Sequence, residues 1–544
     1  MKKVRILSLL SVAALATTVL VAAPTVANAT PACDGKSPIQ TCVGVTSDGA
    51  PYAMQVPANF NGTVALYSHG YRYNVDIPAA IPLIGGYKIT NTPEPVPGGN
   101  AAVAQYFFSQ GVAIVGSGFA RQGWNPDSAI KTNVELIDTF KKQFPKTTKV
   151  VAWGSSLGGV ITQGLAEKYP NLIDAAAPLC MADNIAPQLT MAGDFLWGVK
   201  VLFDPTIKGG NYSAGAAGVA ESYADLGKVF TVMGKLQAAL ATGAWPDTAS
   251  ETGKALAAAG VPSRSALLLL GLMAGLPTQS AHFDSISGPE GALKLTFPLA
   301  LSPALAILEN GTNAAALAVL ATQDVEAQAG GAIFDNTATD YAARIDGERV
   351  IFNAALSGNT VIDALLGALS AANPGAPRAK ANPAAVAKMN SLHVNTGKIN
   401  VPTILMVGVA DPITPAGASQ RLVDLYAEQY AAEKAAARKA YQTSRTYSNP
   451  TNKLLMLWNT TPESYTKFDA AGSPITTTPA ASGTNHCNFS TAQWLLVART
   501  LVQTSKTGQL PTGGALYTAV RKAGNLSMDK EISVPLLKYY TDNQ

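Results

Sequence analysis

Between residues 52 and 180, short apolar runs alternate with stretches in which apolar residues recur at helical spacing. The runs are short and bounded by polar or turn residues, so they predict buried strands at 63–67, 112–116, 149–153 and 173–179. The stretches between them predict helices at 101–109, 129–144 and 157–169. Strands that alternate with helices form a parallel sheet with covered faces, so the pattern predicts an α/β fold.

The alternation stops after residue 184. Residues 185–395 are rich in Ala, Leu and Gly and mostly helix-like, and their length of about 210 residues far exceeds that of an ordinary connection. Strands are predicted again at 401–407 and 453–458, and helices at 419–441 and 491–503. The sequence therefore predicts one catalytic domain made of residues 30–184 and 396–544, interrupted by a helical insertion. Because ligands bind at the carboxyl edge of such sheets, where the insertion starts, we expect it to form a cap or lid over the site. An independent helical domain is the alternative.

The first 29 residues have the pattern of a signal peptide. Lys2, Lys3 and Arg5 precede an apolar run at 6–23, and small residues lead up to a cleavage site near Ala29. A membrane anchor is the alternative, but no charged stop-transfer flank follows. We therefore expect secretion, to the extracellular space or the periplasm. No later apolar run reaches the roughly 18 residues that span a bilayer, so no stable membrane insertion is expected.

The overall charge argues against a nucleic-acid or anionic-membrane partner. The formal net charge is +4, but without the first 29 residues 36 Lys and Arg face 35 Asp and Glu, which leaves +1. Apolar residues make up 47% of the chain and charged residues 14%, as expected of a globular protein with a large core. The composition indicates no particular oligomeric state.

Four cysteines in an exported chain predict two disulfides. Three pairings exist, and proximity in sequence favours Cys33 with Cys42, which leaves Cys180 with Cys487. No metal or other cofactor is expected, because the chain has neither CxxC nor HExxH. Its histidines are also scattered: His69, His282, His393 and His486.

Residues 154–158 read Gly-Ser-Ser-Leu-Gly and lie between a predicted strand and a predicted helix. G-x-S-x-G in that context is typical of a nucleophile elbow. Gly154 and Gly158 allow a sharp reversal without a Cβ clash, and the helix N-terminus then points at the reacting centre. A glycine-rich turn without chemistry is the alternative reading. The flanking elements favour Ser156 as the nucleophile.

A serine nucleophile needs a base within hydrogen-bond reach and a group that orients the base. His486 lies in a polar loop between the last strand and the last helix, and is the expected base. His69 is a rival, but it precedes the elbow. Asp411 closely follows the strand at 401–407 and is the expected acid, with Asp183, just after the strand at 173–179, as its competitor.

The tetrahedral intermediate also needs hydrogen-bond donors for its oxyanion. One expected donor is the backbone N–H of Leu157, which directly follows the nucleophile. The other is the N–H of Tyr71, because Gly70 before it allows the backbone to approach a substrate closely.

In these motifs and their order, the chain resembles the serine hydrolases of the α/β-hydrolase fold. The resemblance rests on His69-Gly70, the elbow, the segment 408–412 (Gly-Val-Ala-Asp-Pro) and Asn485-His486-Cys487, and it covers roughly residues 45–184 and 396–505. It implies a mostly parallel central sheet with flanking helices, and Ser156, Asp411 and His486 as a catalytic triad. The insertion is larger than an ordinary lid, and the residues after Pro511 have no counterpart.

These features predict a secreted serine esterase that cleaves carboxylic esters through an acyl-enzyme. The Ala/Leu/Gly-rich insertion suggests an apolar or bulky acyl group, from a lipid, a polyester oligomer or a plant ester. One alternative is an aminopeptidase-like peptidase or amidase, which would need an acidic cluster for the substrate amine. The candidates for that cluster are scattered along the chain: Asp183, Asp194, Glu309 and Glu326. The other alternative is a non-catalytic binding protein, although such proteins usually lose a triad member.

Overall fold

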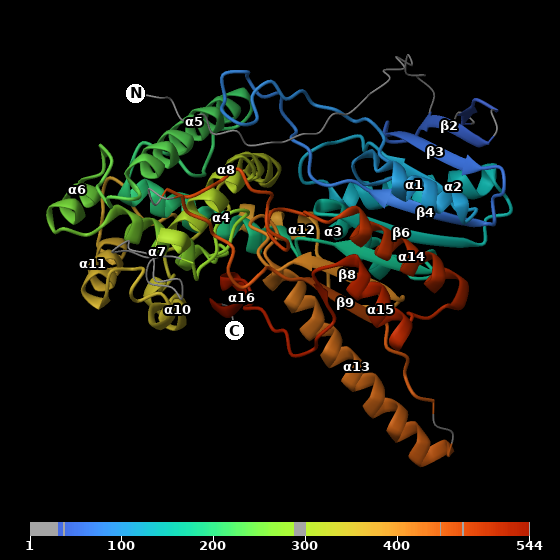
Figure 1. Ribbon diagram of the computed structural model, residues 1–544. Helices are drawn as coiled ribbons and strands as arrows, with labels where there is room; N and C mark the ends of the chain where they lie inside the picture. The colour runs from blue at the N-terminus through green and yellow to red at the C-terminus, as the bar shows by residue number, and fades with distance from the viewer. Residues whose placement is uncertain (1–30, 36–37, 288–300, 446–447, 470–472, 543–544) are drawn as a thin grey trace.

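The structure is a computed structural model that describes residues 31–35, 38–287, 301–445, 448–469 and 473–542 (Figure 1). The signal peptide predicted in residues 1–29 lies outside these ranges.

A single ten-stranded sheet forms the centre of the molecule. In spatial order its strands are β1 (Ala32–Cys33), β2 (Ile39–Val45), β3 (Pro51–Pro57), β5 (Ala113–Ser117), β4 (Thr63–Ser68), β6 (Lys149–Ser155), β7 (Ala175–Leu179), β8 (Thr403–Gly408), β9 (Leu454–Asn459) and β10 (Leu526–Ser527). The strands from β5 to β9 run parallel, and β1, β2, β3 and β10 are antiparallel to their neighbours. All six strands predicted from apolar runs are present, with small shifts of their ends. This sheet, with a nucleophile-elbow sequence after β6, is that of the α/β-hydrolase fold.

Helices cover both faces of the sheet, which explains why β4, β5, β7 and β8 are buried at every position. One face packs against α2 (Pro126–Gln143), α3 (Leu157–Lys168) and the first turns of α13 (Ala416–Ser444). The other face packs against α1 (Ala101–Ser109) and α14 (Thr491–Thr507). The predicted helices therefore supply the two outer layers.

The sequence reading missed the antiparallel strands at both edges. In β3 the buried residues Tyr52, Met54 and Val56 alternate with more exposed ones, a period of two that predicts a half-covered strand. At the other edge, β10 pairs with β9, and α15 (Gly514–Ala523) packs against α14. The residues after Pro511 therefore complete the sheet edge, and α16 (Lys538–Asp542) contacts α4.

The insertion between β7 and β8 is helical (Figure 1). It has a hydrophobic core of its own. Its helices are α4 (Ile185–Leu202), α5 (Ala216–Ala239), α6 (Glu251–Ala258), α7 (Ser263–Ala274), α8 (Leu301–Ala329), α9 (Tyr341–Arg344), α10 (Asp346–Ile351), α11 (Asn359–Ser370) and α12 (Pro383–Leu392). Of these, α8 is long and apolar enough to cross a membrane, contrary to the sequence reading. However, 67% of its most apolar window is buried inside the protein.

A buried carboxylate fastens α8 to the loop that follows β5. Asp324 of α8 is fully buried, pairs with the guanidinium of Arg121, and accepts the backbone N–H of Trp124 at 2.7 Å. The side-chain amide of Asn74 donates to it at 2.9 Å. Gly123 has φ +79°, and a Cβ there would lie 2.3 Å from an Asp324 oxygen, so the loop needs glycine at this position. The insertion is thus held against the carboxyl end of the parallel strands, where the elbow also lies.

Candidate active site

Ser156 occupies a strained turn between β6 and α3. Its φ of 59° and ψ of −125° are unusual for a residue with a side chain. The backbone packs closely on either side: a Cβ at Gly158 would lie 1.9 Å from the carbonyl oxygen of Ser68, and one at Gly154 would lie 2.3 Å from the carbonyl oxygen of Gly158. Glycine at both positions therefore allows the turn that presents the Ser156 hydroxyl.

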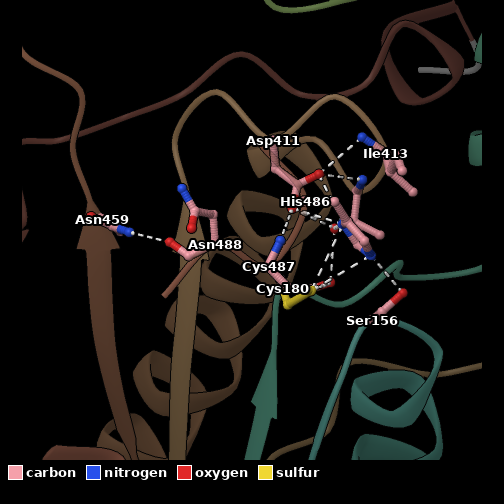
Figure 2. Close-up of polar contacts among 9 residues, drawn as sticks. Ser156, Cys180, Asp411, Ile413, Asn459, His486, Cys487 and Asn488 are labelled. Carbon is pink, nitrogen blue, oxygen red and sulfur yellow. Dashed lines mark hydrogen bonds and ion pairs between the residues drawn. A yellow bond between two sulfur atoms is a disulfide. The ribbon is translucent and has the colours of Figure 1, made fainter. Parts of the chain in front are cut away.

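The three side chains expected from the sequence to form a triad lie in hydrogen-bonded order (Figure 2). The Nε2 atom of His486 is 2.8 Å from Oγ of Ser156. Its Nδ1 atom is 2.9 and 3.0 Å from the two carboxylate oxygens of Asp411. The side chain of His486 is 22% exposed, whereas that of Asp411 is completely buried. A histidine held in this way can accept a proton from the serine while the carboxylate stabilises its charged form.

Three backbone N–H groups fix the carboxylate of Asp411. Those of Ile413 and Thr414 donate to Oδ1 at 2.9 Å each, and that of Cys487 donates to Oδ2 at 3.1 Å. The hydroxyl of Thr414, a residue that the sequence reading missed, also bonds the carbonyl oxygen of Cys180 at 2.8 Å. The pattern Asp-x-x-Thr, in which an aspartate accepts the N–H two and three residues later, is a local signal that could have indicated it.

The loop that carries His486 is tethered twice. Cys487 forms a disulfide with Cys180, which directly follows β7, and their Cα atoms are 5.5 Å apart. The N–H of Ala410 donates to the carbonyl oxygen of Gly483 at 2.9 Å and so joins the acid loop to the histidine loop. The remaining cysteines, Cys33 and Cys42, pair with each other as the sequence favoured.

The competitor for the acid, Asp183, has other partners. Asp183 is 2% exposed. Its carboxylate accepts a hydrogen bond from Nε of Arg421 at 2.8 Å and another from the hydroxyl of Tyr540 near the C-terminus. Burial raises the pKa of Asp183, while Tyr540 and Arg421 act to lower it. Its contacts fasten the C-terminal segment to the sheet and do not include His486.

The other histidines have structural partners. Nδ1 of His69 donates to the carbonyl oxygen of Gly70 at 2.7 Å, and burial lowers the pKa of His69 to about 4, so its ring is neutral. His393 is buried beside Asn395 at 2.8 Å. His282 is 2.7 Å from Glu309 within the insertion, which raises the pKa of His282.

The backbone expected to supply the oxyanion donors lies beside Ser156. Leu157 is the first residue of α3, so its N–H has no acceptor within the helix. On the other side, a Cβ at Gly70 would lie 3.3 Å from Cβ of Ser156, which shows how closely the loop after β4 approaches. Tyr71, Ser156 and Leu157 line one cavity.

This cavity is mostly apolar, with a volume of about 80 Å³. Its walls come from the elbow, from the acid loop and from two helices of the insertion, α4 and α8. The aliphatic residues that line it include Ile185, Leu189, Leu317, Ala318 and Ala321. A cavity with these walls suits an apolar group attached to the atom that Ser156 attacks.

Within the described part of the chain, one group of side chains has ligand-type atoms close enough to share a metal ion. It consists of Asp411, His486 and Cys487, with these atoms within 4.8 Å of one another. The sulfur of Cys487 is bonded to Cys180 and so offers no thiolate. The arrangement suits a hydrogen-bonded triad better than a metal site.

Comparison with known proteins gives distant structural similarities only. No protein-family model and no curated protein sequence matches the chain. Feruloyl esterase B from Aspergillus oryzae is similar over 87% of this chain and 81% of its own, at 13% identity and a TM-score of 0.33. Another esterase from Aspergillus oryzae has the same coverages, 11% identity and a TM-score of 0.36. A putative dipeptidyl aminopeptidase IV from Bacteroides ovatus is similar over 28% of this chain and 22% of its own, at 18% identity and a TM-score of 0.20. The fold assignment rests on the strand order and not on these low similarities.

The first prediction concerns the acid. We expect Asp411→Asn to lower kcat by about 10⁴-fold, because an amide favours the wrong tautomer of His486 and cannot stabilise its charged form. Asp183→Asn should lower the melting temperature, through the loss of its ion pair with Arg421, and change kcat much less. Steady-state kinetics and thermal melts of both variants test this. If the Asp183 variant is inactive and the Asp411 variant is active, Asp183 is the acid that orients the histidine and Asp411 is not.

The second prediction concerns the disulfide beside His486. We expect Cys180→Ala with Cys487→Ala to lower kcat between about ten- and a hundredfold, because a freed loop misplaces the imidazole. The matched control is Cys33→Ala with Cys42→Ala, which removes the other disulfide at the sheet edge and should leave kcat within about twofold. Both double variants are compared by kcat at a temperature where each remains folded. An equal kcat for the two would show that the Cys180–Cys487 tether does not position the base.

Proposed function

We propose that this protein is a serine hydrolase that cleaves carboxylic esters through an acyl-enzyme. The observation that carries the proposal is the hydrogen-bonded series from Ser156 through His486 to Asp411, in which Ser156 lines an apolar cavity. Ser156 is the nucleophile, His486 the general base and Asp411 the residue that orients the histidine.

In the first half of the reaction, Nε2 of His486 takes the proton of Ser156 as Oγ attacks the ester carbonyl. The N–H groups of Leu157 and Tyr71 stabilise the oxyanion, each typically contributing about 3–4 kcal/mol. His486 then gives the proton to the leaving alcohol, and the acyl group remains bonded to Oγ. In the second half, His486 takes a proton from water as its oxygen attacks the acyl carbon. His486 then gives that proton to Oγ of Ser156 as the bond between the acyl carbon and Oγ breaks, which releases the acid and restores the enzyme.

Residues 185–395 act in this proposal as a cap that sets the acyl preference. Two observations support the role: α4 and α8 supply walls of the cavity, and the buried Asp324 holds α8 in place. Burial of an apolar acyl group against these walls stabilises the bound ester, by about 25 cal/mol per Å² of apolar surface. The catalytic domain then consists of residues 30–184 and 396–544.

Two alternative functions are less well supported. An aminopeptidase would need free carboxylates near Ser156, but Asp194 pairs with Arg344, Glu309 contacts His282, and Glu326 accepts the N–H groups of two insertion residues. None of these carboxylates is among the residues described as lining the cavity. A non-catalytic binding protein would have no need for three side chains within hydrogen-bond reach of one another.

Secretion is part of the proposal. Two disulfides join all four cysteines among the described residues, as is usual for proteins of oxidising compartments. The sequence pattern that ends at Ala29 is that of a signal peptide, which fits export.

The third prediction tests the nucleophile. We expect Ser156→Ala to lower the kcat for p-nitrophenyl esters by roughly 10⁴–10⁶-fold, with the residual rate due to the oxyanion donors. Ser155→Ala is the matched control, because Ser155 bonds the hydroxyl of Tyr67 at 2.8 Å and not His486, and its effect should be much smaller. Circular dichroism checks that both variants are folded. Activity of Ser156→Ala within tenfold of the parent would exclude this serine as the nucleophile.

A further inference from the structure

The cavity beside Ser156 contains polar atoms without partners in otherwise apolar walls. Gln188 of α4 is 9% exposed, and neither its Oε1 nor its Nε2 makes a hydrogen bond within the described protein. Trp124, in the loop after β5, is 4% exposed, and its buried Nε1 also makes no hydrogen bond within the described protein. Both residues line the cavity, and so does Tyr71, whose buried hydroxyl also makes no hydrogen bond within the described protein.

Such groups are costly in a folded protein. A buried donor or acceptor without a partner loses its hydrogen bonds to water and gains none in exchange. Ile185, Leu189 and Leu317 present only hydrocarbon to the cavity. The polar residues Tyr71, Ser156 and Thr414 also line it, but none of them bonds the unpartnered atoms of Gln188 and Trp124. Three unsatisfied side chains that line one cavity, those of Gln188, Trp124 and Tyr71, therefore point to a polar group on the ligand.

We propose that the cavity binds an apolar acyl group that carries a neutral hydroxyl remote from the ester carbonyl. This inference rests on the proposed function and specifies its substrate class. The acyl group remains bonded to Ser156 in the intermediate, so it must occupy space that Ser156 lines. Its hydroxyl bonds the amide of Gln188 and the indole N–H of Trp124.

The chemistry of these atoms selects a hydroxyl. Nε1 of Trp124 and Nε2 of Gln188 can only donate, whereas Oε1 of Gln188 can only accept. A hydroxyl both donates and accepts, and so can bond groups of both kinds. An ether or ketone oxygen would leave Oε1 unpaired. A charged group is disfavoured because the described lining residues include no Lys, Arg, Asp or Glu to compensate its charge.

The fourth prediction uses matched pairs of p-nitrophenyl esters that differ only in the hydroxyl. One arm compares 6-, 8- and 10-hydroxyalkanoates with the corresponding alkanoates, and the other compares 3-(4-hydroxyphenyl)propanoate with 3-phenylpropanoate. An aliphatic or an aromatic hydroxyl could supply the same chemistry, and the two arms distinguish them. We expect kcat/KM to be at least about tenfold higher for the hydroxylated member of at least one pair. This is opposite to the preference of a purely apolar cavity.

Three variants connect that preference to the cavity. Gln188→Leu should reduce the hydroxyl preference by about tenfold or more, mainly through lower kcat/KM for the hydroxylated ester. Trp124→Phe, which removes only the N–H donor and part of the ring, should reduce it less. The control, Leu317→Met, changes the apolar wall of the same cavity and should affect both members of a pair together. A parent enzyme that favours the plain ester in every pair, or an unchanged preference in Gln188→Leu, would overturn the inference.

Binding separates this inference from the proposed function. Calorimetry with Ser156→Ala measures the affinity for methyl 8-hydroxyoctanoate, methyl octanoate and the methyl esters of the aromatic pair, with no hydrolysis required. Tighter binding of a hydroxylated ester that is lost on adding Gln188→Leu supports the cavity inference, whether or not the parent hydrolyses esters. If the parent hydrolyses no ester, the proposed function is overturned. Hydrolysis that depends on Ser156 but shows no hydroxyl preference in binding or turnover would overturn the cavity inference alone.

Discussion

The candidate active site depends on one steric constraint, the close packing of the turn that holds Ser156 in a backbone conformation with positive φ. Gly158 lies against the carbonyl of Ser68, and the N–H of Ser156 donates to the carbonyl oxygen of Leu179 at 3.0 Å. The turn is thus fixed by both strands that flank β6, namely β4 and β7. A residue in such a conformation is retained only where its surroundings determine it fully, and here they direct the hydroxyl toward His486.

The other two side chains of the candidate triad are also held in place by contacts around them. Asp411 and His486 lie on separate loops, after β8 and after β9, and neither loop is a regular element. Backbone hydrogen bonding between Ala410 and Gly483, the N–H donors to Asp411 and the disulfide at Cys487 join the two loops into one unit. The candidate site is therefore a set of loops made rigid by the carboxyl end of the sheet and by cross-links. This arrangement lets residues on loops keep a fixed geometry.

Much of the sheet and the candidate triad could be predicted from the sequence because their signals are local. Continuous apolar runs identify strands buried on both faces, and the strand-turn-helix context identifies the elbow. The antiparallel edge was missed because β3 alternates and so gives a weaker signal. The partners of Asp183 and the cavity positions of Gln188 and Trp124 depend on contacts between residues far apart in sequence, which no local pattern specifies.

The central claim is that Ser156 is a nucleophile activated by His486. Fluorophosphonate labelling followed by peptide mapping tests it most directly, because the reagent phosphonylates an activated serine with loss of fluoride and needs no knowledge of the natural ester. We predict a single phosphonyl group on Ser156 in the parent and much slower labelling of a His486→Ala variant. Labelling of a different serine, or labelling of Ser156 at the same rate in both proteins, would contradict it.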